Sequence, residues 1–340
     1  MRTFKLLASA ALLSLGALSG AAEPEIAAKS VRDDVFPKNA ARFADGIVGI
    51  PDIEYANIIG YRPLTLDLYV HDEPANGPAR PLIVWVHGGG WDRGDSRISG
   101  AFANYPAVLA SLAARGYAVA SVNYRLAGEA RFPAALRDVK SAIRYLRFNA
   151  AKFGISPDKV ILWGGSAGGH LAALAADTCG DTAFEPEKST GRLPKSAADA
   201  AKPLAASDCV QAAVIWYGVF DLPTYAKSAS AGGEQSTVLR SLGNFLGCDP
   251  VSCGEPASPI AHVSAATPPM LLIHGTADKT VPSVQTEIMA EKLKKAGVRV
   301  ETLLIPGVDH GLIGPTQEAT RAASLQALQR TFDFMDAAVK

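Results

Sequence analysis

The chain has 340 residues, 48% of them hydrophobic, and its 33 basic side chains balance 33 acidic ones. This length and composition predict one large globular domain and exclude a disordered chain. Because the formal net charge is zero, no overall field would draw the protein to nucleic acid or to an anionic membrane, and we expect no nucleic-acid partner.

The first segment, residues 1–22, has the pattern of a cleaved signal peptide. Arg2 and Lys5 supply a positive start, and the apolar run that ends at Leu18 is too short to span a bilayer and is followed by small residues. We therefore expect an exported protein, periplasmic or secreted, without stable membrane insertion. Its mature part would be a single domain over residues 23–340. An uncleaved membrane anchor is the alternative.

Strand-like apolar runs alternate with helix-like segments along the rest of the chain. Strands are predicted at 62–70, 80–90, 117–126, 159–163, 210–220, 269–278 and 298–307. Helices are predicted at 105–116, 133–154, 169–177, 282–297 and from about 318 to 338. Strands nearly continuous in Val, Ile and Leu, separated by helices, predict an α/β protein whose mostly parallel sheet is covered on both faces.

The run HGGGW, residues 87–91, directly follows an apolar strand. Glycine amides can point toward an oxyanion without a side chain in the way. We expect the amides of Gly89 and Gly90 to contribute to an oxyanion hole, with Gly88 serving the turn. His87 is expected to brace this loop by hydrogen bonding.

Ser166 lies in a G-x-S-x-G motif between a predicted strand and a predicted helix. A sharp turn at this place exposes the hydroxyl and requires small neighbours, and the start of the helix favours negative charge. We therefore expect Ser166 to be a nucleophile and the amide of Ala167 to be a further oxyanion donor. A structural turn serine is the alternative.

Four cysteines allow three disulfide connectivities, and export favours pairing. Each pair that is close in sequence is the simplest choice, so we expect Cys179–Cys209 and Cys248–Cys253. The first bridge would bound an insertion at about 179–209, which is poor in bulky apolar residues. Four reduced thiols are the alternative. The spacing lacks paired zinc ligands, so we expect no metal.

Asp278 comes at the end of a predicted strand, and His310 lies in the loop after the next one. The chain order Ser166, Asp278, His310 is that of the α/β-hydrolase triad, with His310 as base and Asp278 as the acid that orients it. Asp221, which also follows a strand, is the alternative acid. Asp309 is expected to support its loop.

Four apolar side chains near these motifs are candidates for the wall of a substrate pocket: Trp91, Tyr124, Phe220 and Val281. Core packing is the alternative for each. Of the other histidines, His274 is expected to be a core residue and His170 to pack beneath the turn that carries Ser166.

Five stretches, VWVHGGGW, NYRL, GGSAGGHLA, HGTADKTVP and DHG, together resemble α/β-hydrolase esterases of the hormone-sensitive-lipase-like and bacterial feruloyl-esterase-like group, over roughly residues 60–335. The resemblance implies an α/β-hydrolase fold with an eight-stranded sheet and ester hydrolysis without a cofactor. It implies Ser166 as nucleophile, His310 as base, Asp278 as acid and HGGG as the oxyanion loop. The cysteine-bounded insertion departs from the family pattern.

These motifs predict a serine carboxylesterase that hydrolyses short-chain acyl or aryl esters of small molecules through an acyl-enzyme. An amidase or peptidase, for example a formamidase-like enzyme with the same triad, is the alternative. A non-catalytic binding member of the fold is a further alternative, which is disfavoured because both Ser166 and His310 are present.

Overall fold

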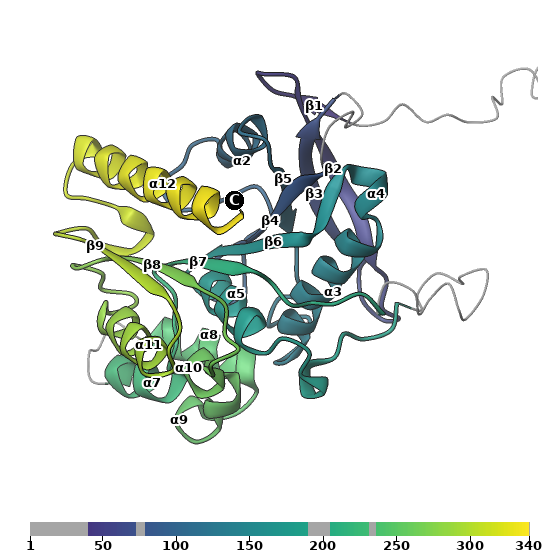
Figure 1. Ribbon diagram of the computed structural model, residues 1–340. Coiled ribbons are helices and arrows are strands. Elements are labelled where there is room, and N and C mark those ends of the chain that lie inside the picture. Colours follow the sequence, from purple (N-terminus) through teal and green to yellow (C-terminus); the bar gives the residue numbers. More distant parts are fainter. Residues whose placement is uncertain (1–39, 73–78, 190–204, 231–235, 340) are drawn as a thin grey trace, which may run out of the picture. The chain divides into compact units, whose positions relative to one another are not determined.

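The computed structural model describes residues 40–72, 79–189, 205–230 and 236–339 (Figure 1). The predicted signal peptide and the middle of the predicted insertion lie outside the described residues. The described part contains a nine-stranded sheet in the order β1-β2-β3-β5-β4-β6-β7-β8-β9. Its strands are β1 (Ala41–Arg42), β2 (Ile47–Ala56), β3 (Leu64–His71), β4 (Arg80–Val86), β5 (Ala118–Val122), β6 (Ile155–Gly165), β7 (Ala212–Trp216), β8 (Met270–Gly275) and β9 (Val300–Ile305).

The neighbours β5, β4, β6, β7, β8 and β9 pair in parallel, in that order across the sheet. The pairs β1–β2, β2–β3 and β3–β5 are antiparallel. This arrangement confirms the predicted α/β architecture. The sheet has one strand more than the eight that the resemblance implied, because the short β1 pairs with the outer edge of β2. β2 was itself not predicted. It contains Pro51, which reads as a strand breaker, and the register with β3 shifts between Ile50 and Ile53.

Helices cover both faces of the sheet. They are α2 (Tyr105–Ala114), α3 (Ala134–Phe148), α4 (Ala150–Phe153), α5 (Ala167–Asp177), α7 (Leu222–Ser230), α8 (Ser236–Leu246), α9 (Pro250–Cys253), α10 (Pro259–His262), α11 (Val284–Lys295) and α12 (Gln317–Val339). Figure 1 shows α2 and α12 on one face and α3, α5 and α11 on the other. The predicted helices are therefore present, while the four from α7 to α10 were not predicted.

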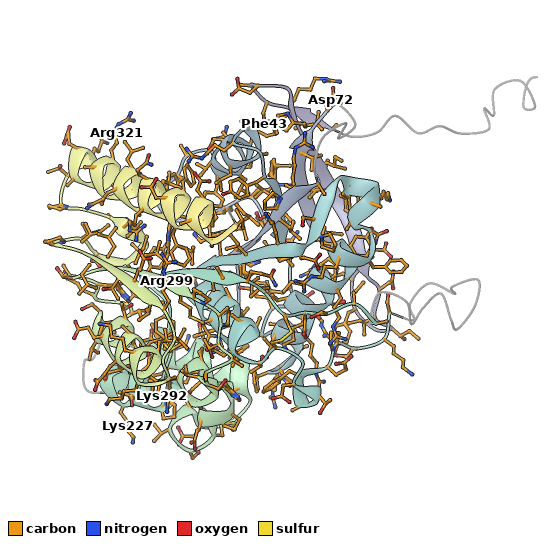
Figure 2. All side chains as sticks on the ribbon, viewed as in Figure 1. Phe43, Asp72, Lys227, Lys292, Arg299 and Arg321 are labelled. Atoms are coloured by element: carbon orange, nitrogen blue, oxygen red, sulfur yellow. A yellow bond between two sulfur atoms is a disulfide. The ribbon has the colours of Figure 1, made fainter. Side chains whose placement is uncertain are left out.

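Two apolar cores result, one on each face, because successive side chains of a strand point to opposite sides. On β4, Leu82 and Val84 belong to the core beneath α3 and α5, and Ile83 and Trp85 belong to the core beneath α2 and α12. Many charged side chains are exposed at the periphery, as the labelled Lys227 and Arg321 illustrate in Figure 2.

Both expected disulfides are present, Cys179–Cys209 and Cys248–Cys253. Disulfides are typical of exported proteins. Among the described helices, none has the length and hydropathy that a membrane span requires.

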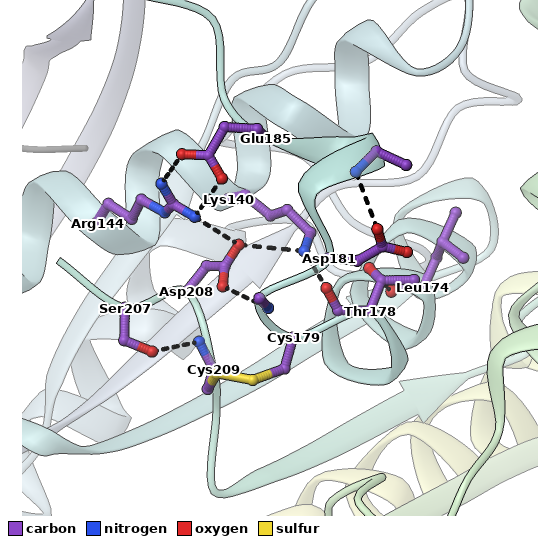
Figure 3. A network of polar contacts seen from close by, with 12 residues as sticks. Lys140, Arg144, Leu174, Thr178, Cys179, Asp181, Glu185, Ser207, Asp208 and Cys209 are labelled. Atoms are coloured by element: carbon purple, nitrogen blue, oxygen red, sulfur yellow. Dashed lines mark hydrogen bonds and ion pairs between the residues drawn. A yellow bond between two sulfur atoms is a disulfide. The ribbon is translucent and has the colours of Figure 1, made fainter. Parts of the chain in front are cut away.

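A buried ion-pair network lies beside the first disulfide (Figure 3). Nζ of Lys140, on α3, is 3.1 Å from Oδ2 of Asp208, and the same oxygen lies 3.3 Å from Arg144. The other carboxylate oxygen of Asp208 accepts from the amide of Gly180 at 3.1 Å. These bonds and the adjacent Cys179–Cys209 bridge fasten both described ends of the predicted insertion to α3 and to the end of α5.

Candidate active site

Ser166 stands at the junction between β6 and α5. Its backbone has φ of 55° and ψ of −125°, in a region that residues other than glycine rarely adopt. Such strain is typical of a serine on a sharp strand-to-helix turn. Ser166 lines a cleft, so the turn presents it to a ligand rather than to the core.

The turn requires small residues because three backbones meet at it. A Cβ atom on Gly168 would lie 2.1 Å from the carbonyl oxygen of Val86 and 2.3 Å from that of His87. No side-chain carbon approaches an oxygen so closely, so α5 can pack against the end of β4 only with glycine at this position. The glycines around Ser166 thus bring the HGGG segment beside it.

His310 bridges Ser166 and Asp278. Its Nε2 is 2.9 Å from Oγ of Ser166, and its Nδ1 is 2.7 Å from Oδ2 of Asp278. A carboxylate oxygen only accepts hydrogen bonds, so Nδ1 carries the proton and Nε2 is left to accept from the serine hydroxyl. The loops after the parallel strands β6, β8 and β9 bring these three side chains together at one edge of the sheet.

Asp278 is buried, and its carboxylate is surrounded by N–H groups. Oδ1 accepts from the amides of Thr280 at 2.9 Å and Val281 at 2.8 Å, and Oδ2 lies 3.2 Å from Nε2 of His274. Burial alone would raise the pKa of Asp278, but the hydrogen bonds from His274, His310 and Val281 and the electrostatic attraction of His310 lower it to about 2. The carboxylate therefore remains ionised beside His310 at neutral pH.

The other two acidic candidates have different partners. Asp221 accepts from the amide and hydroxyl of Thr224 at the start of α7. Asp309 accepts from the amides of Lys279 at 2.9 Å and His310 at 2.7 Å, which fits the loop-supporting role expected for it. Of the three aspartates, Asp278 is the one whose carboxylate meets the imidazole of His310.

The glycine segment after β4 lines the cleft together with Ser166. Gly89 has φ of 117°, and its carbonyl oxygen accepts from the amides of Asp92 and Arg93, so the chain turns back on itself. Within the described ranges, neither the Gly89 amide nor the Gly90 amide donates a hydrogen bond to the protein. Ala167 is the first residue of α5, where an amide has no partner in a preceding helical turn. Donors of the kind expected for an oxyanion hole are thus gathered near Ser166.

The comparisons with known proteins agree with this geometry. The sequence matches the BD-FAE family model over residues 66–293. The chain belongs to the BD-FAE family. It is 32% identical to esterase LipQ of Mycobacterium tuberculosis over 264 residues, and this alignment covers 76% of this chain and 56% of LipQ. It is also 32% identical to esterase LipC of the same organism, over 75% of this chain and 60% of LipC. The chain therefore spans little more than half the length of these curated relatives.

Solved structures share the fold of this BD-FAE member. A truncated carbohydrate esterase from gut microbiota matches with a TM-score of 0.67 and 27% identity, covering 87% of this chain and 98% of that one. An esterase of Thermogutta terrifontis matches with a TM-score of 0.59 and 29% identity, covering 84% and 90%. The resemblance to α/β-hydrolase esterases is confirmed.

The cleft of this BD-FAE member has a volume of about 490 Å³. Trp91 and Val281, two of the predicted wall residues, line it. Tyr124 and Phe220 do not, and both are completely buried. Tyr124 stacks on His87 with ring centroids 4.3 Å apart and donates its hydroxyl to the His87 carbonyl oxygen at 2.9 Å. The expectation for these two residues is corrected: they are core residues, and Tyr124 supports the glycine segment from below.

Several lining residues were missed in the sequence. They are Tyr217, Val219 and Tyr225 after β7, Val238 and Ser241 on α8, and Thr280 beside Asp278. Tyr217 packs edge-on against His310, with ring centroids 4.9 Å apart. The position of Tyr217 directly after β7 could have identified it as a lining residue, because the carboxyl ends of parallel strands meet at the edge where α/β proteins bind ligands.

One group of three potential metal ligands occurs in the described part of the chain: Cys179, Asp208 and Cys209. The two sulfur atoms are joined in a disulfide, and Asp208 pairs with the buried Lys140. These side chains are therefore engaged with one another and do not suit a metal ion.

Proposed function

We propose that the chain is a serine carboxylesterase that acts through an acyl-enzyme. The observation that carries the proposal is the continuous hydrogen-bonded series from Ser166 through His310 to Asp278, with distances of 2.9 and 2.7 Å. Beside it lie the amides of Gly89 and Gly90, which donate to no group in the part of the chain that the structure describes. The names of LipQ and LipC as esterases support the same reaction.

In the proposed mechanism, Oγ of Ser166 attacks the carbonyl carbon of the ester while Nε2 of His310 takes its proton. Asp278 holds the Nδ1–H of His310 and stabilises the imidazolium. The amides of Gly89, Gly90 and Ala167 receive the developing oxyanion. His310 then protonates the leaving alcohol, and a water molecule deprotonated by His310 releases the acid from Ser166.

We infer short-chain acyl or aryl esters as the substrates. A cleft of about 490 Å³ suits a small ester, and Trp91, Val219 and Val281 give it apolar walls. The esterase of Thermogutta terrifontis has structures with bound propionate and bound butyrate, which supports short acyl groups by analogy.

The test is a panel of p-nitrophenyl esters from acetate through butyrate and octanoate to palmitate, with Ser166→Ala as the matched control. We expect the highest kcat/KM for acetate or butyrate and a loss of roughly 10⁵-fold or more in the variant. p-Nitroacetanilide distinguishes the alternative: hydrolysis of this anilide as fast as the ester would identify an amidase. No ester turnover by the wild-type protein would contradict the proposal.

We further infer that the protein is exported and that residues 1–22 are its cleaved signal peptide, leaving a single domain over 23–340. The two disulfides support export. Expression with periplasmic and medium fractionation, followed by amino-terminal sequencing, should find a chain that begins near residue 23. Retention of Met1 on a cytoplasmic protein would contradict the inference.

A further inference from the structure

His170 lies one helical turn after Ser166 on α5 and is completely buried. Its amide donates to the carbonyl oxygen of Ser166 at 2.9 Å. Its ring reaches two other segments, since Nδ1 is 3.1 Å from Nε1 of Trp91 and Nε2 is 2.7 Å from the carbonyl oxygen of Ala257. One side chain thus joins the helix that carries Ser166 to the end of the glycine segment and to the turn before α10.

The two partners determine the protonation of the ring. A carbonyl oxygen only accepts, so Nε2 of His170 must carry a hydrogen to bond Ala257. The indole nitrogen of Trp91 only donates, so Nδ1 must be unprotonated to accept from it. Both contacts therefore require the neutral imidazole with its proton on Nε2.

Trp91 needs such support because its backbone is strained. It follows Gly90 directly and has φ of 62°, a left-handed conformation that a bulky residue rarely adopts. Its carbonyl oxygen accepts from Ala127 at 2.8 Å, and its ring stacks on Phe245 of α8 at 5.0 Å. The bond to His170 links the Trp91 side chain to α5 by a directional contact.

We propose that His170 is a positioning residue for the oxyanion loop: by holding the indole of Trp91, it fixes the amides of Gly89 and Gly90 relative to Ser166. The inference rests on the proposed ester hydrolysis and deepens it. These amides meet full negative charge only after the carbonyl carbon has been attacked. Misplacing them therefore raises the barrier of the chemical step and leaves substrate binding nearly unchanged.

The kinetic test compares His170→Leu, which fills the space without polar atoms, with His170→Gln, which can still accept and donate. We expect kcat of the leucine variant to fall about 10- to 100-fold while KM changes by less than about 3-fold, and the glutamine variant to regain part of the loss. His262→Gln is the matched control, because His262 lies near the surface on α10 and bonds the carbonyl oxygen of Pro256. It should retain wild-type kinetics.

A double-mutant cycle separates positioning from general destabilisation. Trp91→Phe keeps the stacked ring and removes the indole donor, so it should lower kcat to a similar extent. The double variant of Trp91→Phe with His170→Leu should be no slower than the slower single variant, because the second change removes a bond that is already lost. Losses that multiply in the double variant would overturn the proposal.

A substrate-free measurement makes failure of this proposal distinguishable from failure of the proposed function. The chain has four tryptophans, so ¹⁵N-tryptophan labelling yields four indole signals, and Trp91→Phe identifies one of them. That signal should move upfield in His170→Leu, and imidazole spectra should show a proton on Nε2 of His170. An unmoved indole signal, or wild-type kcat in a folded His170→Leu protein, would overturn the proposal. If the His170→Leu variant does not fold, a wild-type kcat in Trp91→Phe would overturn the proposal. Absence of ester turnover in the wild type would contradict the proposed function instead.

Discussion

The hydroxyl of Ser241 donates a 2.6 Å hydrogen bond to Oδ2 of Asp92. Asp92 lies two residues after Gly90 in the loop that follows β4, whereas Ser241 lies on α8 and lines the cleft. The bond therefore ties the proposed oxyanion loop to a helix that was not predicted. α8 also contributes Val238 to the cleft wall, so the helix that lines the cleft is the one that is hydrogen-bonded to the loop.

Ser241→Ala is expected to leave the partly buried carboxylate of Asp92 without this donor, at a cost of about 1–3 kcal/mol in the free energy of unfolding. A looser loop should also lower kcat for p-nitrophenyl acetate by about 10-fold. Urea unfolding and steady-state kinetics measure the two effects. Ser228→Ala removes an exposed hydroxyl that bonds the Thr224 carbonyl oxygen on α7, and it should change neither quantity. A Ser241→Ala protein that behaves like this control would contradict the prediction.

Asp278→Asn is expected to reduce kcat by about 10⁴-fold. The amide would offer a donor where His310 needs an acceptor, so the imidazole would lose the proton arrangement that leaves Nε2 free to take the serine proton. Asp221→Asn is the matched control, because Asp221 bonds Thr224 and not His310, and its kcat should stay near the wild-type value. The assignment of the acid would be wrong if Asp221→Asn alone abolished turnover.

Gly168→Ala tests the close approach of α5 to the end of β4. Alanine ordinarily favours a helix over glycine by about 1 kcal/mol. Here the added Cβ would lie 2.1 Å from the Val86 carbonyl oxygen, so we expect a loss of about 3 kcal/mol or more in unfolding free energy and little residual activity. Gly128→Ala, in an exposed turn where an added Cβ has no atom within 4 Å, should be neutral. Equal melting temperatures for the two variants would disprove the steric argument.

The side chains that the sequence predicted best are those whose place follows from a strand end. Ser166, Asp278 and His310 each follow an apolar run that must form a parallel strand, and such strands end at one edge of the sheet. Their convergence therefore follows from the order of elements. The 2.9 and 2.7 Å contacts among them do not, because they depend on rotamers and loop packing.

The errors have physical causes of a different kind. Tyr124 and Phe220 lie next to strand ends, as cleft residues do, but an apolar ring is equally stable in the core, and no local pattern separates the two environments. β2 was not predicted because it contains Pro51, which lies where the register with β3 shifts. In the sequence, a proline at such a bulge cannot be distinguished from a proline in a loop.

The helices from α7 to α10 were missed for different reasons. α9 and α10 have four residues each, too few to show a period, whereas α8 carries Val238, Leu242 and Phe245 at helical spacing and could have been predicted. α7, α8 and α9 pack against one another, and α10 packs against α5.

Two buried histidines should make the fold sensitive to mild acid. Burial lowers the pKa of both His87 and His170 from 6.5 to about 4, against smaller raising effects of their backbone hydrogen bonds. Between pH 6.5 and about pH 4 these two histidines are protonated in the unfolded chain but not in the folded chain. Their contribution to stability is therefore fully present above about pH 6.5 and is lost as the pH falls toward 4. Each histidine would contribute about 3 kcal/mol to the loss. Asp177 opposes it, because burial raises the pKa of its carboxyl and the folded state takes up that proton first.

The contribution of His170 can be isolated by comparing wild type with His170→Gln, since glutamine does not titrate. Urea unfolding of both proteins at about pH 7 and about pH 4.5 gives two differences in unfolding free energy. We expect the wild type to lose about 2 kcal/mol more than the variant over this interval, whatever the variant costs at neutral pH. Asp278 does not confuse the result, because its pKa of about 2 keeps it ionised throughout. A fully buried imidazole that accepts from Trp91 should take up a proton less readily in the folded state than in the unfolded state. Parallel pH dependence of the two proteins would contradict this prediction.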